Sequence, residues 1–289
     1  MFQAEVLPAI INGILTGSVY GLIAVGLSLC FGLMGILNFA HGSIVMLGMY
    51  ATYYFYTLSG VNVYWAILLV VPLFFIFGVI LHGGLFRFML DAPHNNQILV
   101  SIGLLIFVNN LAMMIFSPNV RTLQISFLGQ GISFGESILS FSRLLAFAMA
   151  LVMFSSLILF LKFSHTGKAL RACSQNRDGA KICGIDVPKI YSLSFAITAA
   201  FAGLAGLLIL PFSGVYPEIG DTFILTAFII IVLGGMGRIG GTFWAAVLIG
   251  VAEALGATFM TSSLKYLVPF LIFIIVLLFR PAGLFVKAS

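Results

Sequence analysis

The sequence predicts an all-α polytopic membrane protein with about eight or nine transmembrane helices. Hydrophobic residues fill 62% of the 289 positions and charged residues only 7%, whereas about 25% of an ordinary soluble domain is charged. The apolar runs are long and do not alternate with polar residues, which favours helices over a transmembrane β-barrel. We therefore expect one transmembrane domain over residues 1–289.

Nine apolar stretches approach the roughly 20 residues that a transmembrane helix needs. They lie at residues 8–31, 40–58, 64–86, 97–117, 141–161, 191–212, 222–236, 243–260 and 265–280. The second and seventh are short or interrupted by Gly and polar residues. Nine crossings are the first choice, and eight crossings with one re-entrant stretch are the alternative.

Basic residues predict how these helices are oriented. Six of the 13 Lys and Arg residues lie in the segment 162–189, which we call the basic segment: Lys162, Lys168, Arg171, Arg177, Lys181 and Lys189. Loops rich in Lys and Arg stay on the cytoplasmic side. We therefore expect a cytoplasmic C-terminus, an external N-terminus and a long external loop at 118–142, with a short hairpin over 123–135.

The basic segment also has the pattern of a surface helix. Asp178 suits the first turn of a short helix, where its carboxylate faces free N–H groups, and Gly184 suits a left-handed helix end. We expect this helix to lie on the membrane surface and to meet a cytoplasmic partner. The charge of the segment also serves to fix topology, so both roles are compatible.

Polar residues inside the apolar stretches are candidates for a translocation pathway. Asn38 and His41 interrupt the second stretch, either as a broken helix beside a path or as caps of a simple turn. Asn109 and Asn110 either line a path or, more commonly, form hydrogen bonds between helices. The charged carboxylate of Glu253 would be costly to place in lipid. This favours a position on the translocation pathway over a purely structural pairing with a polar neighbour.

Small residues predict where helices pack closely. Gly13, Gly17 and Gly21 recur every four residues in the first stretch, which favours packing within the chain over a subunit interface. A second pattern repeats, since Gly234, Met236, Gly237 and Gly250 follow the spacing of Gly32, Met34, Gly35 and Gly48. Two Gly-interrupted segments in corresponding places indicate a central pathway.

Several kinds of chemistry are not expected from this sequence. Cys30, Cys173 and Cys183 lack the spacing of zinc ligands, and we expect free thiols, no metal site and no cofactor in this chain. No phosphate-binding loop with Lys and Ser or Thr is present, so ATP would be hydrolysed elsewhere and the chain would be no enzyme. The positive charge follows the loops, which gives no indication of nucleic acid.

Several motifs taken together resemble one family. They are NFAHG at 38–42 followed by LGMY, TGKALRACSQNRDGAKICGI at 166–185, LGGMGRIGG at 233–241, VAEALGA at 251–257 followed by SSLKY, and RPAGLF at 280–285. Over almost its whole length the chain resembles permease subunits of bacterial ABC importers for branched-chain amino acids, of the LivH type.

The resemblance implies a fold, a set of partners and a coupling site. The fold would be the importer permease fold of the vitamin B12 and ribose permease kind, in the bacterial inner membrane. The partners would be a second permease subunit that is a paralogue of this chain, two ATPase subunits that bind ATP, a periplasmic substrate-binding protein and membrane lipid. The coupling residues would be Arg177, Asp178, Gly179, Ala180 and Gly184, with Asp and Gly replacing the Glu and first Ala of the general importer motif.

Three other functions remain open at this point. A urea or short-chain amide permease shares much of the pattern and is the nearest alternative. A secondary carrier would use Glu253 as its proton or cation site, but it would not need the basic surface helix. A channel would place NFAHG at the break of a helix, and it needs no cytoplasmic motor either.

Overall fold

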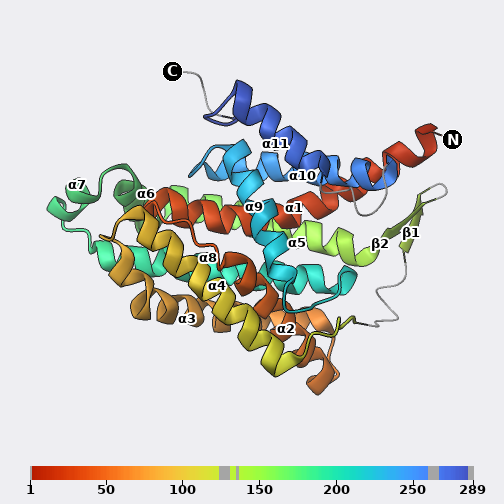
Figure 1. The fold of residues 1–289 in the computed structure, drawn as a ribbon, viewed down its shortest axis with the longest axis horizontal. Helices are drawn as coiled ribbons and strands as arrows, with labels where there is room; N and C mark the ends of the chain where they lie inside the picture. Colours follow the sequence, from red (N-terminus) through yellow and green to blue (C-terminus); the bar gives the residue numbers. More distant parts are fainter. Residues whose placement is uncertain (1, 124–130, 135–136, 260–266, 286–289) are drawn as a thin grey trace.

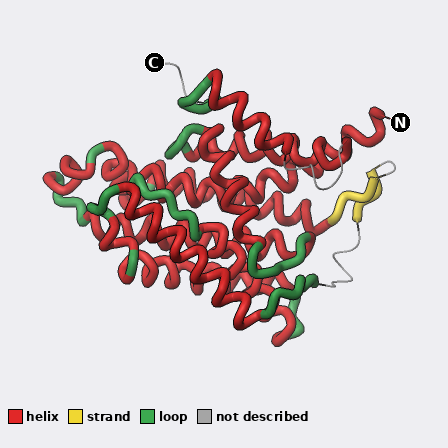
Figure 2. Tube along the Cα trace, viewed as in Figure 1, coloured by secondary structure: helices red, strands yellow, loops and turns green. Residues whose placement is uncertain are grey.

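The computed structural model describes residues 2–123, 131–134, 137–259 and 267–285. The described chain is helical apart from one two-stranded hairpin (Figures 1 and 2). Parts of the predicted external loop and of the ninth predicted stretch, together with Lys287, lie outside the described residues.

All nine predicted stretches correspond to helices. They are α1 (Phe2–Met34), α2 (His41–Ser59), α3 (Ile67–Gly84), α4 (His94–Phe116), α5 (Phe141–Phe163), α8 (Val187–Ile209), α9 (Ile219–Gly234), α10 (Ile239–Phe259) and α11 (Leu267–Phe279). Short 3₁₀ turns occupy Val63–Ala66, Phe86–Met89 and Leu210–Phe212. Within the described residues, six helices are long and apolar enough to cross a membrane, and α9 and α11 are shorter apolar helices.

Two helices form the centre of the protein. In their most apolar windows, 78% of the α1 residues and 89% of the α8 residues are buried, against 17% for α4. Helix α1 packs against α10, α8 and α5, while α8 packs against α3 and α2. In Figure 1 the remaining helices surround this pair, with α4 across one side. The outer helices therefore present apolar surface to lipid or to partner subunits.

Glycine permits the closest of these helix contacts. A Cβ atom on Gly17 would lie 2.7 Å from the carbonyl oxygen of Ala246 in α10, and one on Gly13 would lie 2.5 Å from the Cα atom of Val251. The Gly face of the first stretch thus packs within the chain, as the sequence predicted. Since lipid gives apolar side chains no reason to cluster, such backbone contact is a main source of helix association in membranes.

The repeated Gly pattern marks two helix breaks that touch each other. The chain turns between α1 and α2 with Gly35 at φ +69°, and between α9 and α10 with Gly237 at φ +81°. A Cβ atom on Gly32 would lie 2.8 Å from the Cα atom of Gly237. The two interrupted segments are therefore side by side, which the sequence spacing alone did not establish.

The loop between α4 and α5, which we predicted to be external, contains a hairpin that lies later in the chain than the predicted one. Strands β1 (Gly131–Phe134) and β2 (Ser137–Ser140) pair antiparallel, with Gly131 opposite Ser140. The prediction over 123–135 covered only the first strand, and residues 124–130 lie outside the described part. Earlier in the loop, Arg121 and Val215 exchange backbone hydrogen bonds of 2.9 and 2.8 Å. This bridge ties the loop after α4 to the one after α8.

Replacing Gly250 by Ala is expected to destabilise the protein, because Gly250 packs directly against the backbone of Gly13 and Gly17. Overpacking of this kind costs about 1–3 kcal/mol, and thermal unfolding in detergent measures it. Gly103→Ala is the matched control, since its Cβ atom would meet open space. Equal unfolding temperatures for the two variants would contradict the packing account.

Candidate functional site

The basic segment folds into two short helices at one end of the molecule (Figure 1). Helix α6 (His165–Gln175) begins where Gly167 N–H donates to Ser164 Oγ at 2.8 Å, and α7 (Arg177–Ile182) begins where Gly179 N–H donates to Asn176 Oδ1 at 2.8 Å. The N-cap of α7 is thus Asn176, and Asp178 follows in its first turn. Gly184 ends this helix with φ +80°, which confirms the predicted left-handed conformation.

Helix α7 divides its residues between the protein body and the solvent. Ala180 is buried and packs the helix onto the body. Asp178, Gly184 and Ile182 are exposed, and Ile182 has 88% of its surface accessible. Ile182 thus offers an apolar side chain on a helix whose neighbouring residues are charged or polar. Sequence reasoning missed it, although an isolated Ile between charged and polar neighbours is a visible signal.

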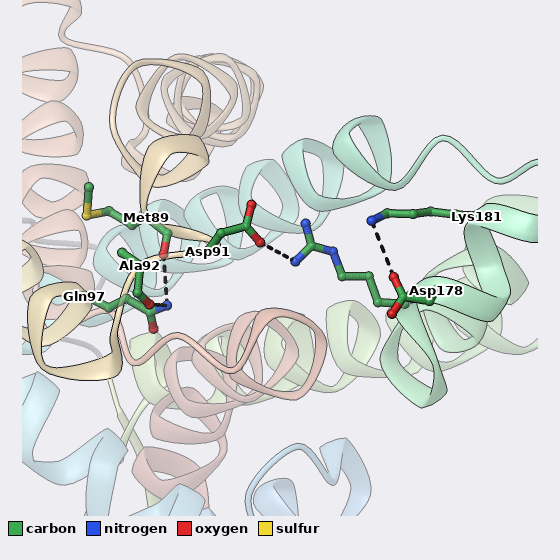
Figure 3. Close-up of polar contacts among 7 residues, drawn as sticks. Met89, Asp91, Ala92, Gln97, Asp178 and Lys181 are labelled. Carbon is green, nitrogen blue, oxygen red and sulfur yellow. Dashed lines mark hydrogen bonds and ion pairs between the residues drawn. The ribbon is translucent and has the colours of Figure 1, made fainter.

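Arg177 connects α7 to another loop instead of pointing freely into solvent. Its guanidinium donates to Asp91 Oδ1 at 2.9 Å and lies 5.7 Å from the ring centre of Tyr191. The hydrogen bond to Asp91 raises the pKa of Arg177 above its ordinary value. The Asp91 loop is itself fixed, since Gln97 Nε2 donates to the carbonyl oxygens of Met89 and Ala92 at 2.9 and 3.0 Å (Figure 3).

The contacts of Asn38 and His41 hold the turn between α1 and α2. Asn38 Oδ1 accepts from the N–H of Ala40 at 3.1 Å, and His41 Nε2 lies 3.0 Å from the carbonyl oxygen of Ile23. Both side chains are buried. Asn38 thus closes the turn and His41 joins the start of α2 to α1, while Ala40, the N-cap residue of α2, has no side-chain capping bond.

The two adjacent asparagines, Asn109 and Asn110, lie on different faces of α4. Asn109 is buried, accepts from Ser43 Oγ at 2.8 Å and donates to Asp221 Oδ1 at 2.9 Å. Asn110 is exposed on the outer face of α4 and donates to the carbonyl oxygen of Ile106 in its own helix at 2.7 Å. Only Asn109 therefore joins other helices, linking α4 to α2 and α9.

Glu253 lines a large cavity, which we call the large cavity. This cavity has a volume of about 520 Å³ and lies among α1, α5, α9, α10 and the turn after α8, away from α6 and α7. Arg143 lines it too, donates to Asn12 Oδ1 at 2.9 Å and lies 5.5 Å from the ring centre of Phe212. The sequence analysis did not single out Arg143, because a charge near a helix end looks like a topology signal.

Neither Asn38, His41, Asn109 nor Asn110 borders this cavity. The five predicted pathway residues thus do not form one site, and Glu253 alone of them lies at the large opening. Within the described ranges, no three His, Cys, Asp or Glu side chains gather as metal ligands.

Comparison with known proteins identifies the family. Residues 9–277 match the family model described as the permease component of a branched-chain amino acid transport system. The chain belongs to this family. It is accordingly the permease component of such a transport system and not its ATPase, in agreement with the resemblance seen in the sequence.

The similarity to two named relatives covers nearly the full chain. The branched-chain amino acid permease LivH of Salmonella typhimurium is 32% identical over 94% of this chain and 93% of its own length. BraD of Pseudomonas aeruginosa is 32% identical over 96% of this chain and 95% of its own. LivM of Salmonella typhimurium shows a shorter similarity, 33% identity over 41% of this chain and 28% of that protein.

The two asparagines give a matched pair of variants. Asn109→Ala removes one hydrogen bond from buried Ser43 and one from half-buried Asp221, and we expect a loss of about 1–3 kcal/mol in the free energy of unfolding. Asn110→Ala removes a bond within one exposed helix, and we expect a change within about 0.5 kcal/mol. Chemical denaturation in detergent compares them, and equal losses would contradict the assigned contacts.

A charge swap tests the anchor of α7. Asp91→Arg and Arg177→Asp alone each place like charges together, so amide hydrogen exchange in α7 should become faster. The double variant restores an opposite pair, and we expect it to slow exchange again. Because the carboxylate is exposed, the effect should weaken at high salt. Unchanged exchange in both single variants would exclude a positioning role for this ion pair.

Proposed function

We propose that this chain is the transmembrane permease subunit of an ATP-driven ABC importer for Leu, Ile and Val in the bacterial cytoplasmic membrane. The match of residues 9–277 to the permease family carries the proposal. The names of the relatives, which refer to high-affinity branched-chain amino acid transport, support the same substrates. In the described part of the chain, six long apolar helices together with the shorter α9 and α11 support eight crossings, and α2 would be a ninth. We infer a permease fold of the vitamin B12 and ribose permease kind.

The proposed assembly contains a second permease subunit, two ATPase subunits and a periplasmic binding protein. Similarity to LivM, a second branched-chain amino acid permease, supports a paralogue as the partner permease. Orientation follows from the basic segment, which places α6, α7 and the C-terminus in the cytoplasm and the N-terminus outside. The large cavity then opens toward the external face, where a binding protein would deliver the substrate.

We assign docking on the ATPase to Arg177, Asp178, Gly179, Ala180 and Gly184, with different tasks. Asp178 and Gly184 present an exposed surface together with Ile182, whose apolar side chain is suited to a pocket on the partner. Arg177 and Ala180 hold the helix in place through Asp91 and the protein body. Gly179 N–H donates the N-cap hydrogen bond to Asn176 Oδ1 at the start of the helix.

The packing beside the helix breaks supports a route from this surface into the membrane domain. A cavity of about 190 Å³ lies between α6 and the helix breaks, and it is lined by Leu170, Arg171, Gly32 and Gly237 among others. Movement of α6 and α7 by the ATPase would therefore reach both helix breaks directly. Binding of ATP at a distant subunit would in this way select between outward-open and inward-open states.

Ile182 gives a test of docking that leaves the membrane fold intact. Ile182→Asp should abolish ATPase co-purification and ATP-dependent leucine uptake, because an exposed carboxylate is costly to bury, while membrane levels stay unchanged. Ile182→Val keeps the apolar contact and should retain uptake. Asp178→Lys and Gly184→Val are expected to uncouple transport in the same way. Full uptake with Asp at position 182 would show that this helix does not dock.

The same uptake assay separates the remaining functions. Leucine uptake should fall when ATP is depleted and persist when the proton gradient is collapsed, and unlabelled urea or acetamide should not compete. Competition by urea would indicate the short-chain amide permease. Uptake lost only with the proton gradient would indicate a secondary carrier that uses Glu253.

A further inference from the structure

The large cavity brings together two side chains of opposite charge from distant parts of the chain. Arg143 is the third residue of α5, and Glu253 lies in the second half of α10. Both line the same space of about 520 Å³, which falls within the roughly 300–1,000 Å³ of small-molecule sites. Only 9% of the Glu253 surface is accessible. Burying a carboxylate at this depth is costly, and such residues commonly mark a substrate or ion pathway.

Arg143 is held in one position with capacity to bind an anion. Asn12 Oδ1 accepts a hydrogen bond of 2.9 Å from the guanidinium of Arg143, and the ring of Phe212 lies beside this guanidinium. Its Nε atom is buried and has no hydrogen-bond partner among the residues that the structure describes. A guanidinium has five N–H donors in a planar fork, which matches the two oxygens of a carboxylate.

The remaining wall of the cavity is apolar in part. Ile209, Phe212, Ile219, Phe223 and Ala257 line it along with the two charged residues. A ligand complementary to this space would carry a carboxylate, an ammonium group and an aliphatic side chain. A free aliphatic amino acid has all three at neutral pH, whereas urea and short amides carry neither charge.

We propose that this cavity is a binding site for the zwitterionic amino acid within the membrane subunit. Arg143 binds the α-carboxylate, Glu253 binds the α-ammonium group, and the apolar wall receives the aliphatic side chain. The proposal rests on the proposed function and adds selection by the permease itself, after the substrate has left the binding protein. Arg143 and Glu253 then replace the water that solvates the two charges of the substrate, at the entrance to an apolar region.

Cysteine protection in the assembled transporter tests the site. Ala257 is exposed and lines the cavity, so Ala257→Cys reports occupancy through its rate of modification by a hydrophilic maleimide. Cys30, Cys173 and Cys183 are first replaced by Ala. Leucine, leucinamide and 4-methylpentanoate are compared as protecting ligands, because they differ in the ammonium and carboxylate charges.

Leucine should slow the labelling, and leucinamide and 4-methylpentanoate should each require at least about tenfold higher concentrations, as expected for the loss of one charge-assisted hydrogen bond. Glu253→Gln should remove the preference for leucine over 4-methylpentanoate, and Arg143→Gln the preference over leucinamide. Asn110→Ala is the control and should leave both preferences intact. The comparison of the three ligands on the Ala257→Cys protein tests the site even where a charge variant folds poorly, because that protein keeps Arg143 and Glu253.

Equal protection by all three ligands, or no protection by any of them, would overturn the site. Leucine uptake by the same transporter is measured in parallel. Uptake without protection would exclude the cavity site and leave the proposed function standing. Absence of leucine uptake together with the expected protection pattern would leave the amino acid site standing and exclude the proposed import function.

Discussion

Contact between helix backbones is the constraint on which the rest of this structure depends. Lipid surrounds apolar side chains as readily as other apolar side chains do, so the helices need another reason to associate. Here Gly17 and Gly250 bring α1 against α10, and Gly48 meets Gly203 where α2 crosses α8. These contacts bury the two central helices and leave the outer ones facing outward. The polar features of the protein are arranged around this frame: the Asn109 network fastens α4, and the large cavity lies where α1 and α10 approach α5 and α9.

The positions of the helices could be predicted from the sequence, because hydrophobic length and the left-handed glycine at 184 are local properties. Contacts across the fold could not. Asn109 and Asn110 are neighbours with the same side chain, yet one faces Ser43 and Asp221 and the other faces outward. Their difference depends on the rotation of α4, which a single sequence does not reveal. Arg143 was overlooked for a similar reason, since its role at the cavity appears only when Glu253 of α10 is placed on the same wall.

Under the proposed function, the two ends of the molecule would have different tasks. At one end, α6 and α7 carry capped helix starts, an Arg177 that is bound to Asp91 and an exposed Ile182, which form the surface that we propose for the ATPase. At the other end, charges of opposite sign line a space of the size of a small ligand. Helices α1 and α10 extend from the cavity beside the helix breaks to the walls of this larger cavity, so they would connect the two ends.

The contact between Gly32 and Gly237 has a mechanical consequence. Each glycine belongs to a different helix break, and their backbones are already so close that a Cβ atom on Gly32 would lie 2.8 Å from the Cα atom of Gly237. The two breaks therefore leave no space between their backbones, and one cannot bend toward the other without displacing it. Under the proposed function, a displacement that begins at one break would be passed to the other, so the α1–α2 and α9–α10 pairs would move together.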